Sequence, residues 1–414
     1  MMKFTIPALG IGLALAAPAF AQMGASMESS PPAATPAPAK GPQISPSKGA
    51  LKAIVDLQNA VNAKDAANIP AKVAAAQAVA KSKEDRYLIA VFQRQAALDA
   101  KDNVALAAAV EGIVSSGLVD STKIAALYMD LGIQQFNAKQ FAQASASFEH
   151  ASTITPNDPQ TIELLAQSKS ASGAKGEAAG IFNRAIQARI AAGQKPSDEV
   201  FRSAVQAAYD GKSPTAVELS RQWIAAYPTA DSWRNGIAIY RNLTQPDVEG
   251  TLALMRLMQA TGSLRGAADY RLYATAAAEQ SNLNETKAII DQGIAAKVVD
   301  PTGPLFRDIV DALKSKQIAT EADLAAALKM SPPAPQLLRI GDRYYAMGKY
   351  AEAAAIYKTV LTKPGIDKDV ANLHLGMALA RSGDKAGATA AFNAVTASRA
   401  DVAKYWLLYL QTHA

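Results

Sequence analysis

The chain has 414 residues and a formal net charge of +6; half of the residues are hydrophobic, 6% are aromatic and none is cysteine. The lack of cysteine excludes disulfide bridges, thiol catalysis and cysteine-ligated metal sites. The basic residues are spread without a run of five, so the charge pattern predicts no nucleic-acid-binding segment.

The first 21 residues have the pattern of an export signal. Lys3 precedes an apolar run over 4–17, and Ala19-Phe20-Ala21 has the spacing of a cleavage site. This pattern predicts a secretory signal peptide over 1–21, cleaved after Ala21, and therefore an exported, periplasmic protein. A buried N-terminal helix is the alternative. No later segment has 18 consecutive apolar residues, so we expect no transmembrane segment.

A Pro/Ala-rich segment follows, densest over 31–38. Proline at this density interrupts helices and leaves little to bury. We predict a disordered linker over 22–48, with docking of an extended proline-rich peptide as the alternative. The remaining chain, 49–414, is rich in Ala, the strongest helix former, and alternates apolar and polar residues nowhere over a useful length. It should be all-α.

Two segments in the first half repeat with an offset of 34 residues, 125–157 and 159–190. Small and aromatic residues recur in phase between them: Gly132 and Ala166, Ala144 and Ala178, Phe148 and Phe182, Ala151 and Ala185. A period of this length predicts a helical repeat array in which each helix pair completes its core by stacking on the next.

The centre, about 197–300, keeps the rhythm with looser signatures, and 302–330 should form a shorter, less typical pair. The clearest repeats come last, at 334–367 and 369–400, with an offset of 35. The matched positions are Gly341 and Gly376, Gly348 and Gly383, Ala353 and Ala388, Tyr357 and Phe392. An amphipathic helix over 401–412 should cap the array. Counting breaks gives about ten helix pairs plus this cap.

These repeats resemble the tetratricopeptide repeat, a helix–turn–helix unit of 34 residues. The first clear repeat carries the family's large, small and aromatic positions at Tyr128, Leu131, Gly132, Ala144, Phe148, Ala151 and Pro156. It departs at Gln135, where the family usually has an aromatic residue, and the second repeat lacks the closing proline. The resemblance implies a right-handed superhelical solenoid of antiparallel helix pairs with a concave, partner-binding groove.

The sequence offers no recognisable catalytic or metal site. The three histidines, His150, His374 and His413, have no ligand spacing between them. Two S-x-x-K matches, at Ser45 and Ser172, lie in the linker and in a turn, and their companion motifs are absent. There is no nucleotide-binding glycine motif, and the carboxylates look scattered over solvated helix faces. We therefore expect neither an enzyme nor a cofactor.

The resemblance places eight first-helix residues on the concave groove: Met129, Ile133, Phe136, Glu163, Gln167, Leu338, Asp342 and Tyr345. The family's Lys and Asn clamp for a terminal carboxylate is not implied, because Met129, Ile133, Leu338 and Asp342 occupy the corresponding places. Whether these eight side chains bind a partner or pack inside the superhelix stays open.

The predicted function is a non-catalytic protein–protein interaction scaffold in a bacterial cell envelope. The alternative is an accessory subunit of an envelope assembly or polysaccharide export machine. The partners should be proteins and not nucleic acid. Weak association with anionic envelope surfaces, which the net charge of +6 favours, and self-association are left open.

Overall fold

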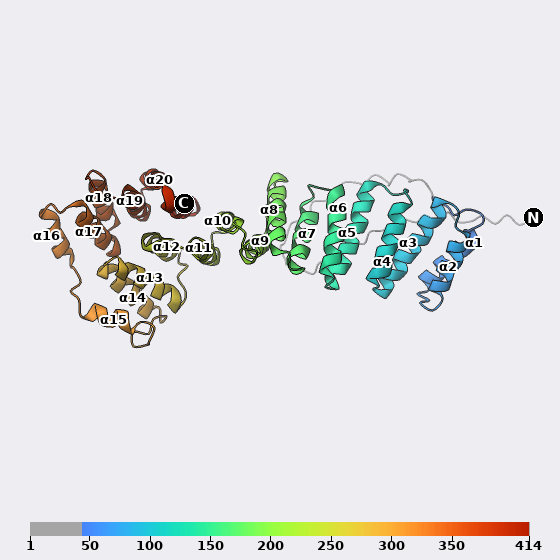
Figure 1. The fold of residues 1–414 in the computed structure, drawn as a ribbon, viewed down its shortest axis with the longest axis horizontal. Coiled ribbons are helices and arrows are strands. Elements are labelled where there is room, and N and C mark those ends of the chain that lie inside the picture. Colours follow the sequence, from blue (N-terminus) through green and yellow to red (C-terminus); the bar gives the residue numbers. More distant parts are fainter. Residues whose placement is uncertain (1–43, 414) are drawn as a thin grey trace, which may run out of the picture. The chain divides into compact units, whose positions relative to one another are not determined.

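The structure is a computed structural model that describes residues 44–413 (Figure 1). Over this range the chain forms 21 α-helices and one short 3₁₀-helix, Ala397–Arg399, and no strand. The expectation of an all-α array of about ten helix pairs followed by one more helix is confirmed. The predicted signal peptide, 1–21, and most of the predicted linker, 22–43, lie outside the described residues.

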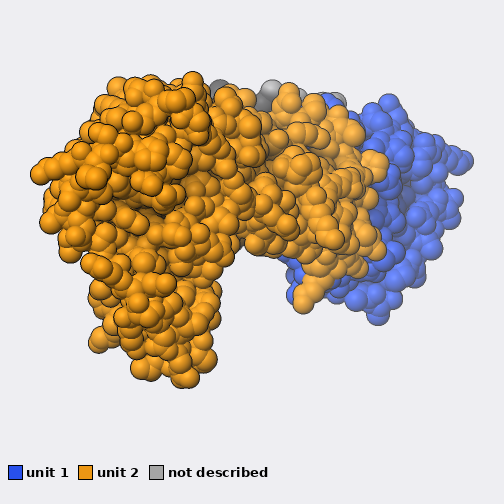
Figure 2. All heavy atoms as spheres, turned by 60° about the vertical axis from the view of Figure 1, so that its left-hand side comes forward, with its two compact units in different colours: residues 1–138 blue, residues 139–414 orange. Residues whose placement is uncertain are grey.

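The chain divides into two units, residues up to Ala138 and residues from Lys139 to Ala414 (Figure 2). Five helices lie in the first unit: α1 Leu51–Asn62, α2 Ile69–Val79, α3 Lys83–Ala100, α4 Asn103–Ser115 and α5 Ser121–Asn137. The second unit begins with α6 Phe141–Ile154, α7 Pro159–Ala171, α8 Lys175–Ala191, α9 Asp198–Asp210, α10 Thr215–Ala226, α11 Ala230–Thr244 and α12 Val248–Ala260. It continues with α13 Ala267–Glu279, α14 Leu283–Ala295, α15 Arg307–Lys314, α16 Glu321–Lys329, α17 Ala334–Ala346, α18 Tyr350–Leu361, α19 Lys368–Ser382, α20 Lys385–Asn393 and α21 Ala400–Thr412.

Helix ends coincide with capping residues in the sequence. Ser82 accepts a hydrogen bond from the Asp85 amide, and the Asp85 carboxylate accepts one from the Ser82 amide, which completes a capping box at α3. Asp85 also accepts hydrogen bonds from the amide and the hydroxyl of Ser47, both at 2.8 Å. Helix α3 is therefore tied to the segment just before α1.

The repeated glycines of the last two clear repeats are sites of close helix packing. A Cβ atom added at Gly341 would lie 2.5 Å from the ring of Tyr357, and one added at Gly376 would lie 2.5 Å from the ring of Phe392. Gly348 and Gly383 end their first helices with φ of 76° and 92°, a conformation that side chains disfavour. The in-phase glycine and aromatic positions thus have the same packing role in both repeats.

Replacing Gly376 by Ala should lower the free energy of unfolding of the second unit by about 1–3 kcal/mol, because the buried Phe392 ring stacks on Trp406 and cannot move away. The matched control is Gly180→Ala in α8, where an added Cβ meets nothing within 4 Å. Gly180→Ala should raise the free energy of unfolding by about 0.5–1 kcal/mol, which is the usual preference of helices for Ala over Gly. Urea unfolding measures both, and equal effects would contradict the packing assigned to Gly376.

The order of packing in the second unit changes after α14. From α6 to α10, each helix packs on the next one along the chain, but α17 packs directly on α14. The intervening helices α15 and α16 are short and make few contacts with the rest of the unit. The stack therefore continues directly from α14 to α17, and the shorter pair expected over 302–330 lies beside it.

The last helix packs beyond the final repeat. Helix α21 contacts α20, as a cap would, and also contacts α10, α12 and α19. Trp406 Nε1 donates to the Ala253 carbonyl at 3.1 Å, and the Tyr405 hydroxyl donates to the Gly236 carbonyl at 3.3 Å. Both side chains are fully buried. The C-terminal helices therefore share one hydrophobic core with α11 to α14.

Candidate functional site

Four helices of the second unit, α12, α14, α17 and α19, meet at a buried ionic network, which contains Arg256, Glu285, Asp342, His374 and Glu249. Arg256 is 0% exposed and comes from α12. Its Nε and Nη2 atoms donate to the two carboxylate oxygens of Glu285 on α14, at 2.8 and 2.7 Å. This bidentate pairing is the strongest arrangement that an arginine and a carboxylate adopt. Its Nη2 also lies 3.6 Å from Asp342 Oδ1.

Two further polar groups complete the environment of Glu285. The Tyr273 hydroxyl on α13 donates to Oε1 at 2.8 Å, and Asn282 Nδ2 donates to Oε2 at 2.7 Å. Each carboxylate oxygen thus accepts two hydrogen bonds, one from Arg256 and one from a neutral group. A buried carboxylate needs such compensation, because it has lost its water.

The other half of the network surrounds His374 on α19, which is 2% exposed. Its Nδ1 lies 2.7 Å from Asp342 Oδ1 on α17, and its Nε2 is in contact with Glu249 Oε1 on α12. The Tyr357 hydroxyl donates to Asp342 at 2.7 Å. Only a protonated imidazole has an N–H group for each of the two carboxylates. The geometry therefore favours a charged histidine.

The direction of the pKa shifts agrees with this geometry. Burial alone would lower the pKa of His374, but Asp342 and Glu249 outweigh burial and raise it to about 9. Burial would raise the pKa of Asp342, but His374 and Arg256 lower it to about 2. Burial raises the pKa of Tyr273 and of Tyr357 further above the usual value. His374 and Asp342 are therefore both charged at neutral pH.

This arrangement joins helices that are distant in the sequence. Glu249 and Arg256 on α12 are linked to Glu285, Asp342 and His374 on α14, α17 and α19. Each of the five groups already has an oppositely charged partner. The network joins the C-terminal repeats to α12 and α14 through ion pairs.

A pocket of about 210 Å³ lies beside the network. Its walls come from α12, α13, α14, α17 and the start of α18, and they include Gln259, Tyr273, Glu285, Tyr345 and Tyr350. The Tyr345 ring lies under the Arg256 guanidinium, with 4.7 Å between the Cζ atom and the ring centre. Glu285 is the member of the network that lines this pocket.

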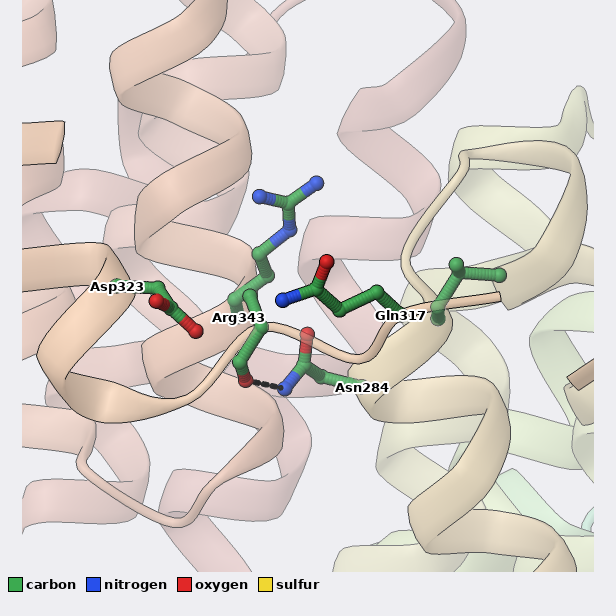
Figure 3. A pocket seen from close by; sticks show the side chains of 6 residues that line it. Asn284, Gln317, Asp323 and Arg343 are labelled. Carbon is green, nitrogen blue, oxygen red and sulfur yellow. Dashed lines mark hydrogen bonds between the residues drawn. The ribbon is translucent and has the colours of Figure 1, made fainter. Parts of the chain in front are cut away.

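A second pocket, of about 220 Å³, lies where the start of α14, the segment before α16, and α17 come together (Figure 3). Asn284 Nδ2 donates to the Ala319 carbonyl at 2.8 Å and fastens that segment to α14. Gln317, Asp323 and Arg343 line the rest. Asp323 is occupied by the cap of α16, where it accepts from the amide and hydroxyl of Thr320.

A third, wider pocket of about 710 Å³ is mainly apolar. It lies over α8, α9 and α10, where Ile190, Pro196, Phe201 and Ala226 are part of its wall. Ile190 in this wall is 52% exposed. A concave apolar surface of this kind is suited to the side chains of a protein partner.

The predicted groove residues do not share one environment. Met129, Ile133 and Phe136 lie on α5 in the first unit and are half-buried. Glu163 and Gln167 lie on α7 in the second unit, also half-buried, and Glu163 forms an ion pair with Arg189 at 2.6 Å.

The three predicted groove residues on α17 belong to the interior of the second unit. Leu338 packs at the edge of its core. Asp342 is part of the ionic network, and Tyr345 is 4% exposed beneath Arg256. These two side chains therefore lie inside the unit and not on an open groove. Partner binding at the other six residues remains a prediction.

The expectation that acidic residues occupy only solvated helix faces is wrong for Glu249, Glu285 and Asp342. Sequence reasoning missed the network because its members come from four helices, and its paired side chains are 29 to 125 residues apart in the sequence. The sequence contained one indication of the network, because Asp342 lies in the same clear repeat as Tyr357 and directly follows the small Gly341. The repeat pattern did not identify a partner for the Asp342 carboxylate.

Within residues 44–413 there is no group of three or more side chains arranged to hold a metal ion. Over the same residues no helix is both long and apolar enough to cross a membrane.

No protein-family profile matches the sequence, and no curated protein matches it. Among solved structures, a tetratricopeptide repeat protein from Parabacteroides merdae is similar at 13% identity with a TM-score of 0.30, over 71% of this chain and 99% of that one. The Naa15/Naa10 complex bound to HypK-THB is similar at 14% identity with a TM-score of 0.26, over 88% of this chain and 66% of that one. Likenesses this distant carry no argument. The assignment of the chain as an all-α array of stacked helix pairs therefore rests on its own repeats and packing.

Proposed function

We propose that the protein is a non-catalytic scaffold of the bacterial cell envelope that binds a segment of a protein partner on its helix-pair surface. The observation that carries the proposal is the contrast between its charged interior and its apolar pocket. The histidine, arginine and carboxylates of the ionic network are paired with one another and nearly inaccessible. The wide pocket over α8 to α10 offers exposed apolar surface instead.

Two features support a partner segment of mixed polarity. Ile190 and Phe201 provide apolar contacts in that pocket, and Lys195 stands at its rim over the Tyr227 ring, 4.0 Å from the ring centre. Interfaces commonly combine apolar anchors with a polar rim. The predicted groove residues Glu163 and Gln167 lie on α7, which packs on α8 and α9. Export to the envelope is proposed from the sequence of residues 1–21 alone.

Photo-crosslinking in the native envelope tests this function. A photoreactive amino acid replaces Gln187, an exposed glutamine of α8 that lines the wide pocket, and in a matched variant it replaces Gln143, an exposed glutamine on α6. We expect crosslinks from position 187 to one dominant protein, identified by mass spectrometry, and few from position 143. Crosslinks only between copies of the chain, or equal patterns from both positions, would contradict a dedicated binding surface at this pocket.

A further inference from the structure

The 220 Å³ pocket of Figure 3 contains an arginine side chain that is not paired within the fold. Arg343 on α17 lines this pocket and is half-buried. Among residues 44–413 its guanidinium has neither an ion-pair partner nor a hydrogen-bond acceptor. A guanidinium has five N–H donors and stays charged at neutral pH, and partial burial removes some of its water. Arg343 is therefore available to a ligand with an anionic group.

The wall of the same pocket contains a carboxylate with one unused oxygen. Asp323 accepts hydrogen bonds from the amide and the hydroxyl of Thr320, at 2.8 and 2.7 Å, and both end at its Oδ2 atom. These bonds lower the pKa of Asp323, so the side chain is charged at neutral pH. Its Oδ1 atom has no partner within the described part of the chain. Asp323 therefore offers a negative charge and a hydrogen-bond acceptor to a ligand.

The two charged groups line one pocket but do not form an ion pair with each other. The elements that carry them are fastened. Asn284 Nδ2 donates to the Ala319 carbonyl at 2.8 Å and ties the segment before α16 to α14, and the capping box of Thr320 and Asp323 fixes the start of α16. A ligand that carries one anionic and one cationic group can pair with Arg343 and Asp323 at the same time. A ligand of a single charge would leave one of them unpaired.

The rest of the wall agrees with a small polar ligand. Gln317 keeps its carboxamide, and Asn284 its Oδ1 atom, without a partner among residues 44–413. Leu283 and Asn284 are the first two residues of α14, so the positive end of this helix lies beside the pocket and favours a carboxylate. The volume of about 220 Å³ is below the range of about 300–1,000 Å³ that is typical for drug-sized ligands.

We propose that this pocket binds a free α-amino acid as its zwitterion. The carboxylate of the ligand pairs with the Arg343 guanidinium, and its ammonium group donates to the Asp323 carboxylate. The carboxamides of Asn284 and Gln317 form further hydrogen bonds with these two groups. The site lies between α14, α16 and α17 and is separate from the proposed partner surface over α8 to α10. Either proposal can therefore fail alone.

Saturation-transfer NMR titration of the purified protein with each of the standard L-amino acids at pH 7 tests the site. We expect at least one of them to bind with a Kd of about 1 mM or tighter. The N-acetyl derivative and the carboxamide of that amino acid each lack one of its two charges. Both should bind about tenfold more weakly or worse, the effect of one lost charge-assisted hydrogen bond.

Three variants make the result decisive. Arg343→Gln and Asp323→Asn should each weaken binding by about tenfold or more. Arg343→Gln should keep the Tm, because the guanidinium has no partner within the described residues, and the amide oxygen of Asp323→Asn can still accept from Thr320. Arg339→Gln, at an exposed position of α17 outside the pocket, is the matched control and should leave binding unchanged.

The proposal is overturned if no amino acid binds, or if the N-acetyl derivative or the carboxamide binds as well as the zwitterion. It is also overturned if Arg343→Gln binds as tightly as the control variant Arg339→Gln.

Discussion

Replacing Arg256 by Met should lower the free energy of unfolding of the second unit by about 3–5 kcal/mol. The substitution keeps most of the side-chain volume and removes only the charge. Glu285 then loses two hydrogen bonds, and Asp342 loses a cation 3.6 Å away, while both carboxylates stay buried. An unpaired buried carboxylate is far more costly than the absence of the whole pair.

The three tryptophans, Trp223, Trp233 and Trp406, all lie in the second unit and are buried, so tryptophan fluorescence during urea unfolding reports on this unit. The control is Arg265→Met, which breaks an exposed pair with Asp231 and should change stability by less than about 1 kcal/mol. The double variant Arg256→Met, Glu285→Met should recover part of the lost stability, because it leaves fewer unpaired charges. Equal effects of Arg256→Met and Arg265→Met would refute a structural role for the network.

The sequence was sufficient for the repeats because their signal is local. Gly341 and Tyr357 are 16 residues apart and lie on the two helices of one pair. They contact each other, which explains why one residue is small and the other large. The same pair of sizes returns at Gly376 and Phe392, and the structure gives both pairs the same contact. The helix count and the all-α class follow from this periodicity.

The packing beyond α14 could not be predicted from the repeats, because it depends on contacts across the chain. An unbroken stack would place α17 on α16 and leave Asp342 and Tyr345 on an open face. In the structure α17 contacts α16 and also packs on α14, where the Asn282 side chain donates to the Asp342 carbonyl at 3.4 Å. That face is thereby buried. The return of α21 to α10 and α12 likewise depends on residues about 150 to 185 positions apart.

The stability of the second unit should fall as the pH rises from about 6.5 to 9, by about 3 kcal/mol in total. Folded His374 has a pKa of about 9, whereas the ordinary value is 6.5. Below pH 6.5 the folded and the unfolded state both hold the His374 proton, so the contribution of the charged histidine to stability is complete. Between the two values only the folded state holds it, so each pH unit removes about 1.4 kcal/mol until the folded histidine also loses its proton.

Asp342 acts in the opposite direction at acid pH. Its pKa is lowered from 3.8 to about 2 in the folded state, so its contribution is complete above 3.8 and is lost as the pH falls toward 2. Between about pH 4 and 6.5 the stabilising contributions of His374 and Asp342 are both complete. The second unit should therefore lose stability on both sides of that interval.

Urea unfolding followed by tryptophan fluorescence at pH 5.5, 7, 8 and 9.5 measures the alkaline side. His374→Gln should be less stable than the parent at pH 5.5, because it leaves Asp342 and Glu249 without the cation between them, and it should show no fall of its own between pH 6.5 and 9. His150→Gln, at an exposed position of α6, is the matched control and should keep the parent's slope. If His374→Gln retains that slope, another group titrates in this range and the imidazolium between the two carboxylates is not its source.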